Sequence, residues 1–195
     1  MFAVAAIVVL SILAGCTDAE KEATVTNFGE EKAYAKNNGV VLTLANGTAA
    51  YYVGGISGKY LSAATYAIGK LNATSSKLNI TSTGTSSSNF KFSVGTWHFD
   101  ANAMNFNSPI LNNQIVSSEI MFYDDTVKGY SDNSLRHVAL HELGHTIGLI
   151  DQNHPQGQHL KDHSVMWYQH IPGQFTAFQD YQEFDIHNIH WKYGK

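Results

Sequence analysis

The chain has 195 residues, of which 44% are hydrophobic and 14% are charged, and its formal net charge is -4 with histidine neutral. A chain of this length can bury one sizeable core but leaves little room for two, so we expect one folded domain, acting as a monomer. The acidic balance offers no basic patch, which argues against a nucleic-acid partner and against membrane association through surface charge.

The N-terminus has the pattern of a bacterial lipoprotein signal peptide. Residues 2–13 are almost entirely apolar, over a length too short to span a membrane comfortably. The Leu-Ala-Gly-Cys that ends at Cys16 resembles the lipobox, in which the cysteine is lipidated and becomes the first mature residue. No Lys or Arg precedes the apolar run, which departs from the usual pattern, and an uncleaved anchor is the alternative. We expect residues 1–15 to direct export, leaving a lipoprotein attached to the membrane at the cell surface, or an extracellular protein.

Residues 16–38 are rich in Glu, Lys, Thr and Asn, a composition typical of a polar tether that holds a domain away from a membrane. Cys16 is the only cysteine, so the mature domain has no disulfide even if it is exported. The stability of the domain must then come from packing and from bound metal.

Residues 39–195 are expected to form the folded domain, of α/β class. Apolar residues recur at helical spacing over 57–73, which predicts a helix. Asn46-Gly47 and Gly54-Gly55 mark turns around a tyrosine pair. Near the C-terminus, apolar residues cover two flanks of a last helix, which predicts their burial: Tyr181, Phe184 and Trp191 on one flank, Ile186, Ile189 and Tyr193 on the other. Strands are expected over 40–44, 78–83, 90–94 and 119–123.

The run His-Glu-Leu-Gly-His, which begins at His141, is the most informative motif in the chain. On a helix, His141 and His145 lie one turn apart on the same face, so both imidazoles can reach one metal ion, with Glu142 beside it. Three residues beyond His145, Gly148 can end the helix and turn the chain sharply. Asp151 follows three residues after this glycine.

The residues around this motif predict the helix that carries it. Asp132, Asn133 or Ser134 can cap its start. A buried stripe is expected opposite the two histidines, formed by Leu140, Leu143 and Ile147. One side of the helix would then pack into the domain while the other opens to a cleft.

The pattern His-Glu-x-x-His-x-x-Gly-x-x-Asp, followed by a methionine turn at 164–168, resembles the metzincin clan of zinc metallopeptidases. Most members have histidine as the third ligand. Asp151 follows the snapalysin-like minority, and His154 is the alternative ligand. By this resemblance Met166 forms the hydrophobic floor beneath the ligands. The resemblance implies a metzincin-like (zincin) catalytic domain similar to that of the matrixins, with a twisted, mixed, mostly parallel sheet and three main helices.

The resemblance further implies a zinc-dependent endopeptidase that acts on a protein or peptide substrate. One catalytic Zn²⁺ would activate a water, with Glu142 as general base. Tyr168 would be an oxyanion donor or fifth ligand, or else would pack in the cleft wall. Trp97 and His98 are candidates for the sheet edge that pairs with extended substrate.

Other interpretations of the acidic and histidine-rich segments stay open. Asp124-Asp125 could bind a structural Ca²⁺ or form an ordinary polar turn. The histidines near the methionine turn could form a second Zn²⁺ site or a solvated loop: His154, His159, His163 and His170. A rival of another class is a non-catalytic zinc-binding surface lipoprotein, or a degenerate peptidase that acts as a binding module. Glu142 argues against it, because a storage or adhesion site needs no base beside the metal.

Overall fold

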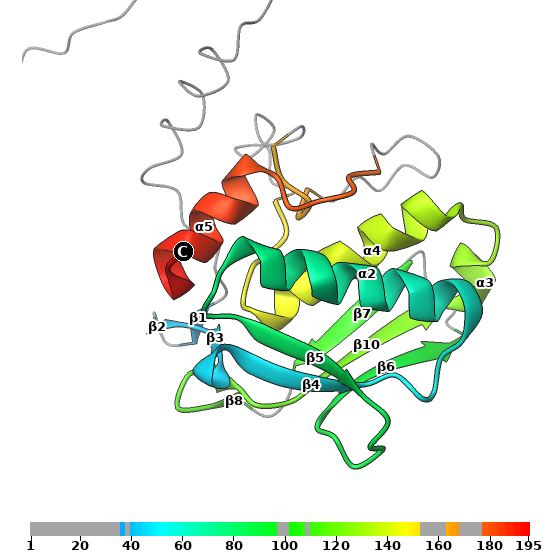
Figure 1. The fold of residues 1–195 in the computed structure, drawn as a ribbon, viewed down its shortest axis with the longest axis horizontal. Coiled ribbons are helices and arrows are strands. Elements are labelled where there is room, and N and C mark those ends of the chain that lie inside the picture. The colour runs from blue at the N-terminus through cyan, green and yellow to red at the C-terminus, as the bar shows by residue number, and fades with distance from the viewer. Residues whose placement is uncertain (1–35, 38–39, 97–101, 108–109, 153–162, 168–176) are drawn as a thin grey trace, which may run out of the picture. The chain divides into compact units, whose positions relative to one another are not determined.

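Five strands form the main sheet of the protein, in the order β5-β4-β6-β10-β7 (Figure 1). Four of them run parallel, and β7 is an edge strand antiparallel to β10. The strands are β4 (Thr48–Tyr52), β5 (Asn79–Thr83), β6 (Phe90–Gly95), β7 (Ala103–Asn107) and β10 (Ser118–Tyr123). The predicted α/β class with a mixed, mostly parallel sheet is therefore confirmed.

This computed structural model describes residues 36–37, 40–96, 102–107, 110–152, 163–167 and 177–195. All of these belong to one compact unit, Glu31–Lys195. The predicted signal peptide, the lipidation site Cys16 and most of the predicted tether lie outside the described residues. Near the end of the predicted tether, Lys36–Asn37 form the short strand β1, antiparallel to β2 (Val40–Val41).

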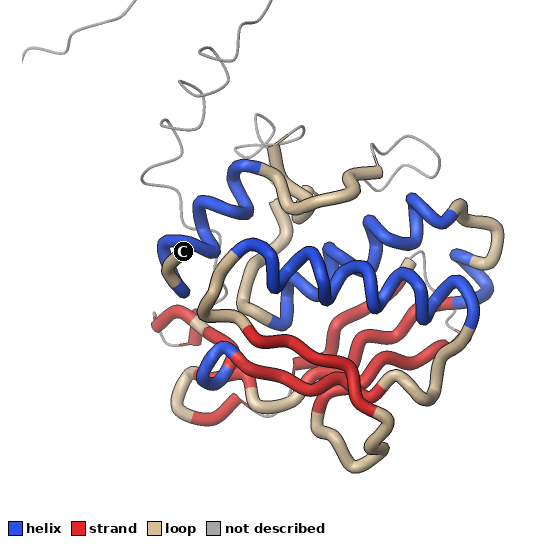
Figure 2. The backbone as a smooth tube through the Cα atoms, in the orientation of Figure 1, coloured by secondary structure: helices blue, strands red, loops and turns tan. Residues whose placement is uncertain are grey.

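Three longer helices accompany the sheet, as predicted: α2 (Gly58–Thr74), α4 (Asp132–Thr146) and α5 (Glu183–Tyr193). A fourth, α3 (Asp124–Val127), has four residues. Helices α2 and α4 lie side by side on one face of the sheet, as the tube trace makes clear (Figure 2). Within the described residues, no helix combines the length and apolarity needed to cross a membrane.

A second, three-stranded sheet has the order β3-β9-β8. It comprises β3 (Thr43–Leu44), β8 (Ile110–Leu111) and β9 (Gln114–Ile115). The predicted strand over 40–44 is thus two short strands with different partners. The turn at 46–47 is present as the 3-10 helix η2 (Ala45–Gly47), where Gly47 has a φ of +66° and a Cβ would meet the Lys77 carbonyl oxygen at 2.4 Å.

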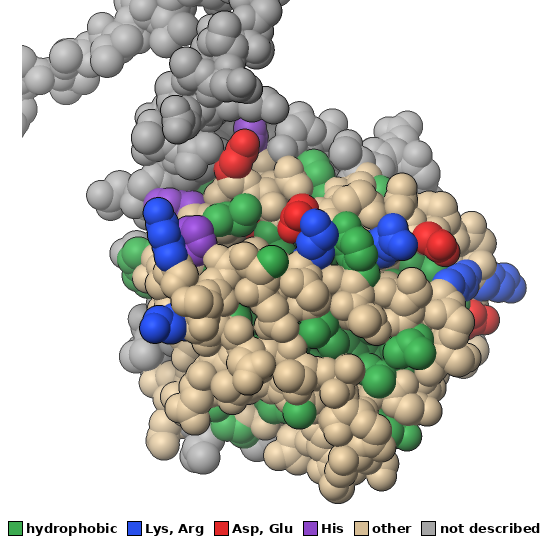
Figure 3. All heavy atoms as spheres, viewed as in Figure 1, with side chains coloured by type: hydrophobic (Ala, Val, Ile, Leu, Met, Phe, Trp, Pro, Cys, Tyr) green, Lys and Arg blue, Asp and Glu red, His purple; other side chains and the backbone are tan. Residues whose placement is uncertain are grey.

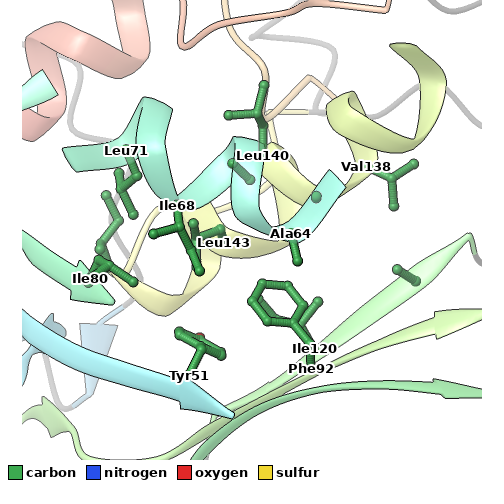
Figure 4. Close-up of a cluster of buried hydrophobic side chains, with 14 of the residues drawn as sticks. Tyr51, Ala64, Ile68, Leu71, Ile80, Phe92, Ile120, Val138, Leu140 and Leu143 are labelled. Atoms are coloured by element: carbon green, nitrogen blue, oxygen red, sulfur yellow. The ribbon is translucent and has the colours of Figure 1, made fainter. Parts of the chain in front are cut away.

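The core lies between the sheet and the helix pair (Figure 4). Tyr51, Phe92 and Ile120 contribute from the sheet and are at most 1% exposed. Helix α2 contributes the small residues Ala63, Ala64 and Ala67, which allow it to pack closely. Helix α4 contributes Leu140 and Leu143, both fully buried. This packing fixes the position of α4, which carries the metal motif, relative to the sheet.

The C-terminal segment is only partly buried. Tyr181, Phe184 and Ile189 are at most 2% exposed, as predicted. The prediction is wrong for Trp191, which is 44% exposed. Trp191 lies in the last turn of α5, on a different side of the helix from Tyr193, which packs against the core.

Candidate metal centre

Helix α4 places the two motif histidines on the face opposite its buried stripe. Leu140, Leu143 and Ile147 are fully buried, which confirms the predicted stripe. The rings of His141 and His145 lie edge to face, with centroids 4.9 Å apart. The helix cap is one residue earlier than predicted, because the Ser131 hydroxyl accepts a hydrogen bond from the Ser134 N–H at 3.2 Å.

Gly148 ends the helix and returns the chain toward the histidines, as predicted. Its φ of +95° lies in a region that side chains with a Cβ rarely adopt. Its N–H donates to the His145 carbonyl at 3.0 Å, and the next N–H, of Leu149, donates to the Gly144 carbonyl at 3.1 Å. This turn brings Asp151 beside the two rings.

The side chains of His141, His145 and Asp151 converge on one point. Their ligand atoms lie within 4.8 Å of one another. Asp151 Oδ1 lies 3.0 Å from His141 Nε2 and 3.4 Å from His145 Nε2. Tetrahedral ligands at 2.0–2.1 Å from one ion are separated by about 3.3 Å, so these spacings suit a shared metal. Asp151 Oδ1 is also shielded from solvent, and its polar neighbours are these two imidazole nitrogens.

Main-chain carbonyls hold both imidazoles in the orientation a metal requires. His141 Nδ1 lies 3.0 Å from the Val165 oxygen, and His145 Nδ1 lies 2.8 Å from the Leu149 oxygen. A carbonyl only accepts, so each Nδ1 carries the proton. In the neutral rings each Nε2 then presents its lone pair to the common point.

The charges of the group favour a cation. Burial opposes the charged form of the His141 imidazole, but the Asp151 and Glu142 carboxylates raise its pKa to about 9. Partial burial opposes the charged form of Asp151, but the two imidazoles hold the pKa of its carboxyl well below the usual range. The group therefore favours positive charge at the point where the three side chains meet, which a bound metal ion would supply.

Glu142 lies beside this group without belonging to it. It is 8% exposed, and burial raises the pKa of its carboxyl even though the two neighbouring imidazoles lower it. The Asn105 main chain also lowers the pKa of this carboxyl, by a smaller amount. A carboxylate with a raised pKa beside a metal site suits proton transfer near neutral pH.

The predicted methionine turn lies directly under the ligand helix. Ser164–Trp167 form a turn, in which the Trp167 N–H donates to the Ser164 carbonyl at 3.2 Å. Met166 is 1% exposed, and its carbonyl accepts a hydrogen bond from Gln152 N–H at 2.9 Å, next to Asp151. The turn therefore contacts both the helix and the segment that carries the third ligand.

A buried carboxylate in α5 supports that turn. Asp185 accepts hydrogen bonds from the Ser164 hydroxyl at 2.6 Å, from the Val165 N–H at 2.7 Å and from the Gln182 N–H at 2.9 Å. Because the Val165 carbonyl oxygen orients His141, Asp185 acts on the ligand through one intervening residue.

Several predicted site residues lie outside the described residues: Trp97, His98, His154, His159, Tyr168 and His170. Two that are described have other partners. His163 Nδ1 lies 2.9 Å from Glu183 Oε2, and Asp124 accepts a hydrogen bond from the Tyr60 hydroxyl. Among the described residues, His141, His145 and Asp151 form the only group of three or more that could hold a metal ion.

Two asparagines of the sheet contact α4, and the sequence analysis did not predict them. Asn105 and Asn107, on the edge strand β7, direct their amides toward α4. Asn105 Nδ2 donates to the Glu142 carbonyl at 2.8 Å and to Thr146 Oγ1 at 2.9 Å, and Asn107 Nδ2 donates to the His145 carbonyl at 2.9 Å. Their spacing of two residues in a run of strand-forming residues was the available signal.

Comparison with known proteins assigns no family to the chain. No protein-family model matches the chain, and a search of curated proteins finds no match.

Proposed function

We propose that the protein is a zinc-dependent endopeptidase. The observation that carries the proposal is the convergence of two imidazoles and one carboxylate oxygen within 4.8 Å, with the buried carboxylate of Glu142 adjacent. Two nitrogens and one oxygen at tetrahedral spacing are typical of a catalytic zinc site with one open position. A structural zinc site would instead use four protein ligands.

Bound zinc would lower the pKa of a coordinated water from 15.7 to about 7 and polarise the substrate carbonyl. Residues of the chain would bind the metal and transfer the proton. His141, His145 and Asp151 hold the ion, and Glu142 takes a proton from the attacking water and passes it to the leaving nitrogen. Burial raises the pKa of the Glu142 carboxyl. This makes the carboxylate a stronger base for taking a proton from the attacking water.

The finer features of the resemblance belong to the same proposal. Met166, Gly148 and the Asp151 position fit a metzincin-like catalytic domain, of the matrixin or snapalysin kind. The signal-peptide pattern at residues 1–15 supports export as a lipoprotein anchored through Cys16, with a protein or peptide at the cell surface as substrate. On the face seen in Figure 3, basic and acidic side chains alternate toward the right, whereas basic and histidine side chains gather at the left.

One substitution tests the role of Glu142 as general base independently of metal binding. Glu142→Gln keeps the shape and the three ligands but cannot accept a proton. We expect this variant to retain one zinc per chain and to lose about 100-fold or more in cleavage of a quenched peptide library. The matched control is Glu119→Gln, because Glu119 bonds to Ser93 and Lys91 on β6 and takes no part in the metal group. That control should keep full activity.

Removal of the metal by a chelator provides a second test. Removal of zinc from the wild type should abolish cleavage, and stoichiometric zinc should restore it. Undiminished cleavage by Glu142→Gln would refute the role of the base. A wild-type protein that binds one zinc but cleaves nothing in the library would favour the non-catalytic binding protein.

A further inference from the structure

Asn105 lies where the sheet edge meets the ligand helix. It belongs to β7, the antiparallel edge strand, and pairs with Ile120 of β10. Ile120 is fully buried beneath the helices, so Asn105 shares the helix-facing side of the sheet. Its amide is thus placed under α4 at the level of Glu142.

The main-chain N–H of Asn105 is directed to the open edge of the sheet. The Tyr123 N–H donates to the Asn102 carbonyl at 3.1 Å, which identifies that pair as hydrogen-bonded. Alternation along the antiparallel ladder then makes Asn105 and Ile120 a non-hydrogen-bonded pair, with the Asn105 N–H free of β10. The Asn105 main chain is one of the groups that lower the pKa of the Glu142 carboxyl, against the larger effect of its burial.

Asn105 therefore holds the main chain of Glu142 from the sheet side. Its side-chain amide donates to the Glu142 carbonyl at 2.8 Å. This contact sets the position of the helix turn from which the Glu142 carboxylate extends.

A buried polar cluster fixes the Asn105 amide itself. Its Nδ2 also donates to Thr146 Oγ1, a hydroxyl that is fully buried. Thr146 Oγ1 lies 2.5 Å from the Tyr51 hydroxyl and 3.3 Å from Ser118 Oγ. The cluster therefore ties strands β4, β10 and β7 to the C-terminal turn of α4.

We propose that Asn105 is a positioning residue for the general base Glu142. The inference rests on the proposed peptidase function and extends it to a residue outside the metal motif. Asn105 fixes the register between the edge strand and the ligand helix, so that the Glu142 carboxylate keeps one position relative to the metal and the attacking water. Loss of this restraint affects the chemical step, because misplacement of a catalytic group by about 1 Å can cost 100-fold in rate.

The test compares two asparagines that each tie a helix to a strand. Asn105→Ala removes the amide under Glu142. The matched control is Asn72→Ala, because Asn72 exchanges hydrogen bonds of 2.6 Å and 2.8 Å with the main chain of Ile80, joining α2 to β5. Zinc-loaded full-length chains are assayed for kcat, KM and bound zinc, and zinc-free chains for deuterium uptake by the amides of residues 142–147.

Asn105→Ala should lower kcat about 10-fold to 100-fold while KM and bound zinc stay within twofold, and should speed exchange in 142–147. Asn72→Ala should lower the melting temperature without these effects. If Asn105→Ala does not fold, the isosteric Asn105→Asp, which also lacks the donor, replaces it. An active wild type with kcat unchanged in the Asn105 variant, or lowered equally in both variants, would overturn the inference alone. An inactive wild type would overturn the peptidase function and the inference with it.

Discussion

Gly144 lies against the sulfur of Met166. A Cβ built on Gly144 would lie 2.5 Å from Met166 Sδ and 3.3 Å from its Cε. The turn at residues 164–167 therefore packs directly on the backbone of α4, between His141 and His145. Only glycine allows this approach.

Gly144→Ala should therefore destabilise the protein, although alanine is the better helix former. We expect a loss of about 1–3 kcal/mol in the free energy of unfolding, as for overpacking in a core. Gly69→Ala in α2 is the control, because a Cβ there meets nothing within 4 Å. That variant should gain up to about 1 kcal/mol. Chemical denaturation of both variants measures the difference, and equal stabilisation would show that Met166 does not press on Gly144.

Asp151→Asn should weaken metal binding more than it weakens the fold. The substitution keeps the shape but removes the negative charge 3.0 Å from His141 Nε2. We expect zinc affinity, measured by competition with a chelator, to fall about 100-fold or more, since even indirect partners of a ligand are worth 10–100-fold. Asp180→Asn, which changes the half-exposed partner of Lys70, should leave zinc affinity unchanged. Unchanged affinity in the Asp151 variant would indicate His154 as the third ligand.

His137 should make the fold sensitive to acid. Burial, with the nearby His141, lowers the pKa of His137 to about 3, and its Nδ1 accepts a hydrogen bond from the Phe178 N–H at 3.1 Å. Between pH 6.5 and 3 the unfolded chain binds a proton that the native ring does not. Native stability should therefore be complete above pH 6.5 and fall as the pH is lowered, by about 1 kcal/mol per pH unit.

His137→Asn tests this dependence, because the asparagine oxygen replaces Nδ1 as acceptor but does not titrate. Urea denaturation between pH 7.5 and 4.5 should give a smaller slope of stability against pH in the variant than in the wild type. Identical slopes would show that His137 is not the source of the acid sensitivity.

Asp185→Ala should damage the methionine turn. It leaves three donors without their carboxylate, the buried groups of Ser164 and Val165 and the partly buried N–H of Gln182. We expect a loss of about 3 kcal/mol or more in the free energy of unfolding, and about tenfold in zinc affinity because Val165 orients His141. Asp132→Ala, at the exposed start of α4, should cost less than about 1 kcal/mol and leave zinc affinity intact. Thermal unfolding and chelator competition measure the two effects.

The local parts of the site were predictable from sequence. His141 and His145 lie on one face because helical periodicity requires it, and Gly148 has the positive φ that its place after the helix implied. The buried stripe with Leu140 followed from the same periodicity. Each of these depends on residues within a few positions along the chain.

The long-range parts were not predictable in the same way. Thr48–Tyr52 forms β4, beside β5 and β6, where the flanking Asn46-Gly47 and Gly54-Gly55 indicated only turns. The edge strand β7 was missed because Asn105 and Asn107 turn polar side chains inward, opposite to the usual alternation. Their partners are carbonyls of α4, nearly 40 residues away. Polarity alone cannot identify such partners.

The most direct test of the account is a crystal structure of the zinc-loaded protein, with anomalous scattering measured at the zinc edge. The account predicts one strong peak within about 2.0–2.2 Å of His141 Nε2, His145 Nε2 and an Asp151 oxygen, with Glu142 beside it but not bound. Absence of a peak at this point, or a peak held by other residues while these three side chains point apart, would contradict it.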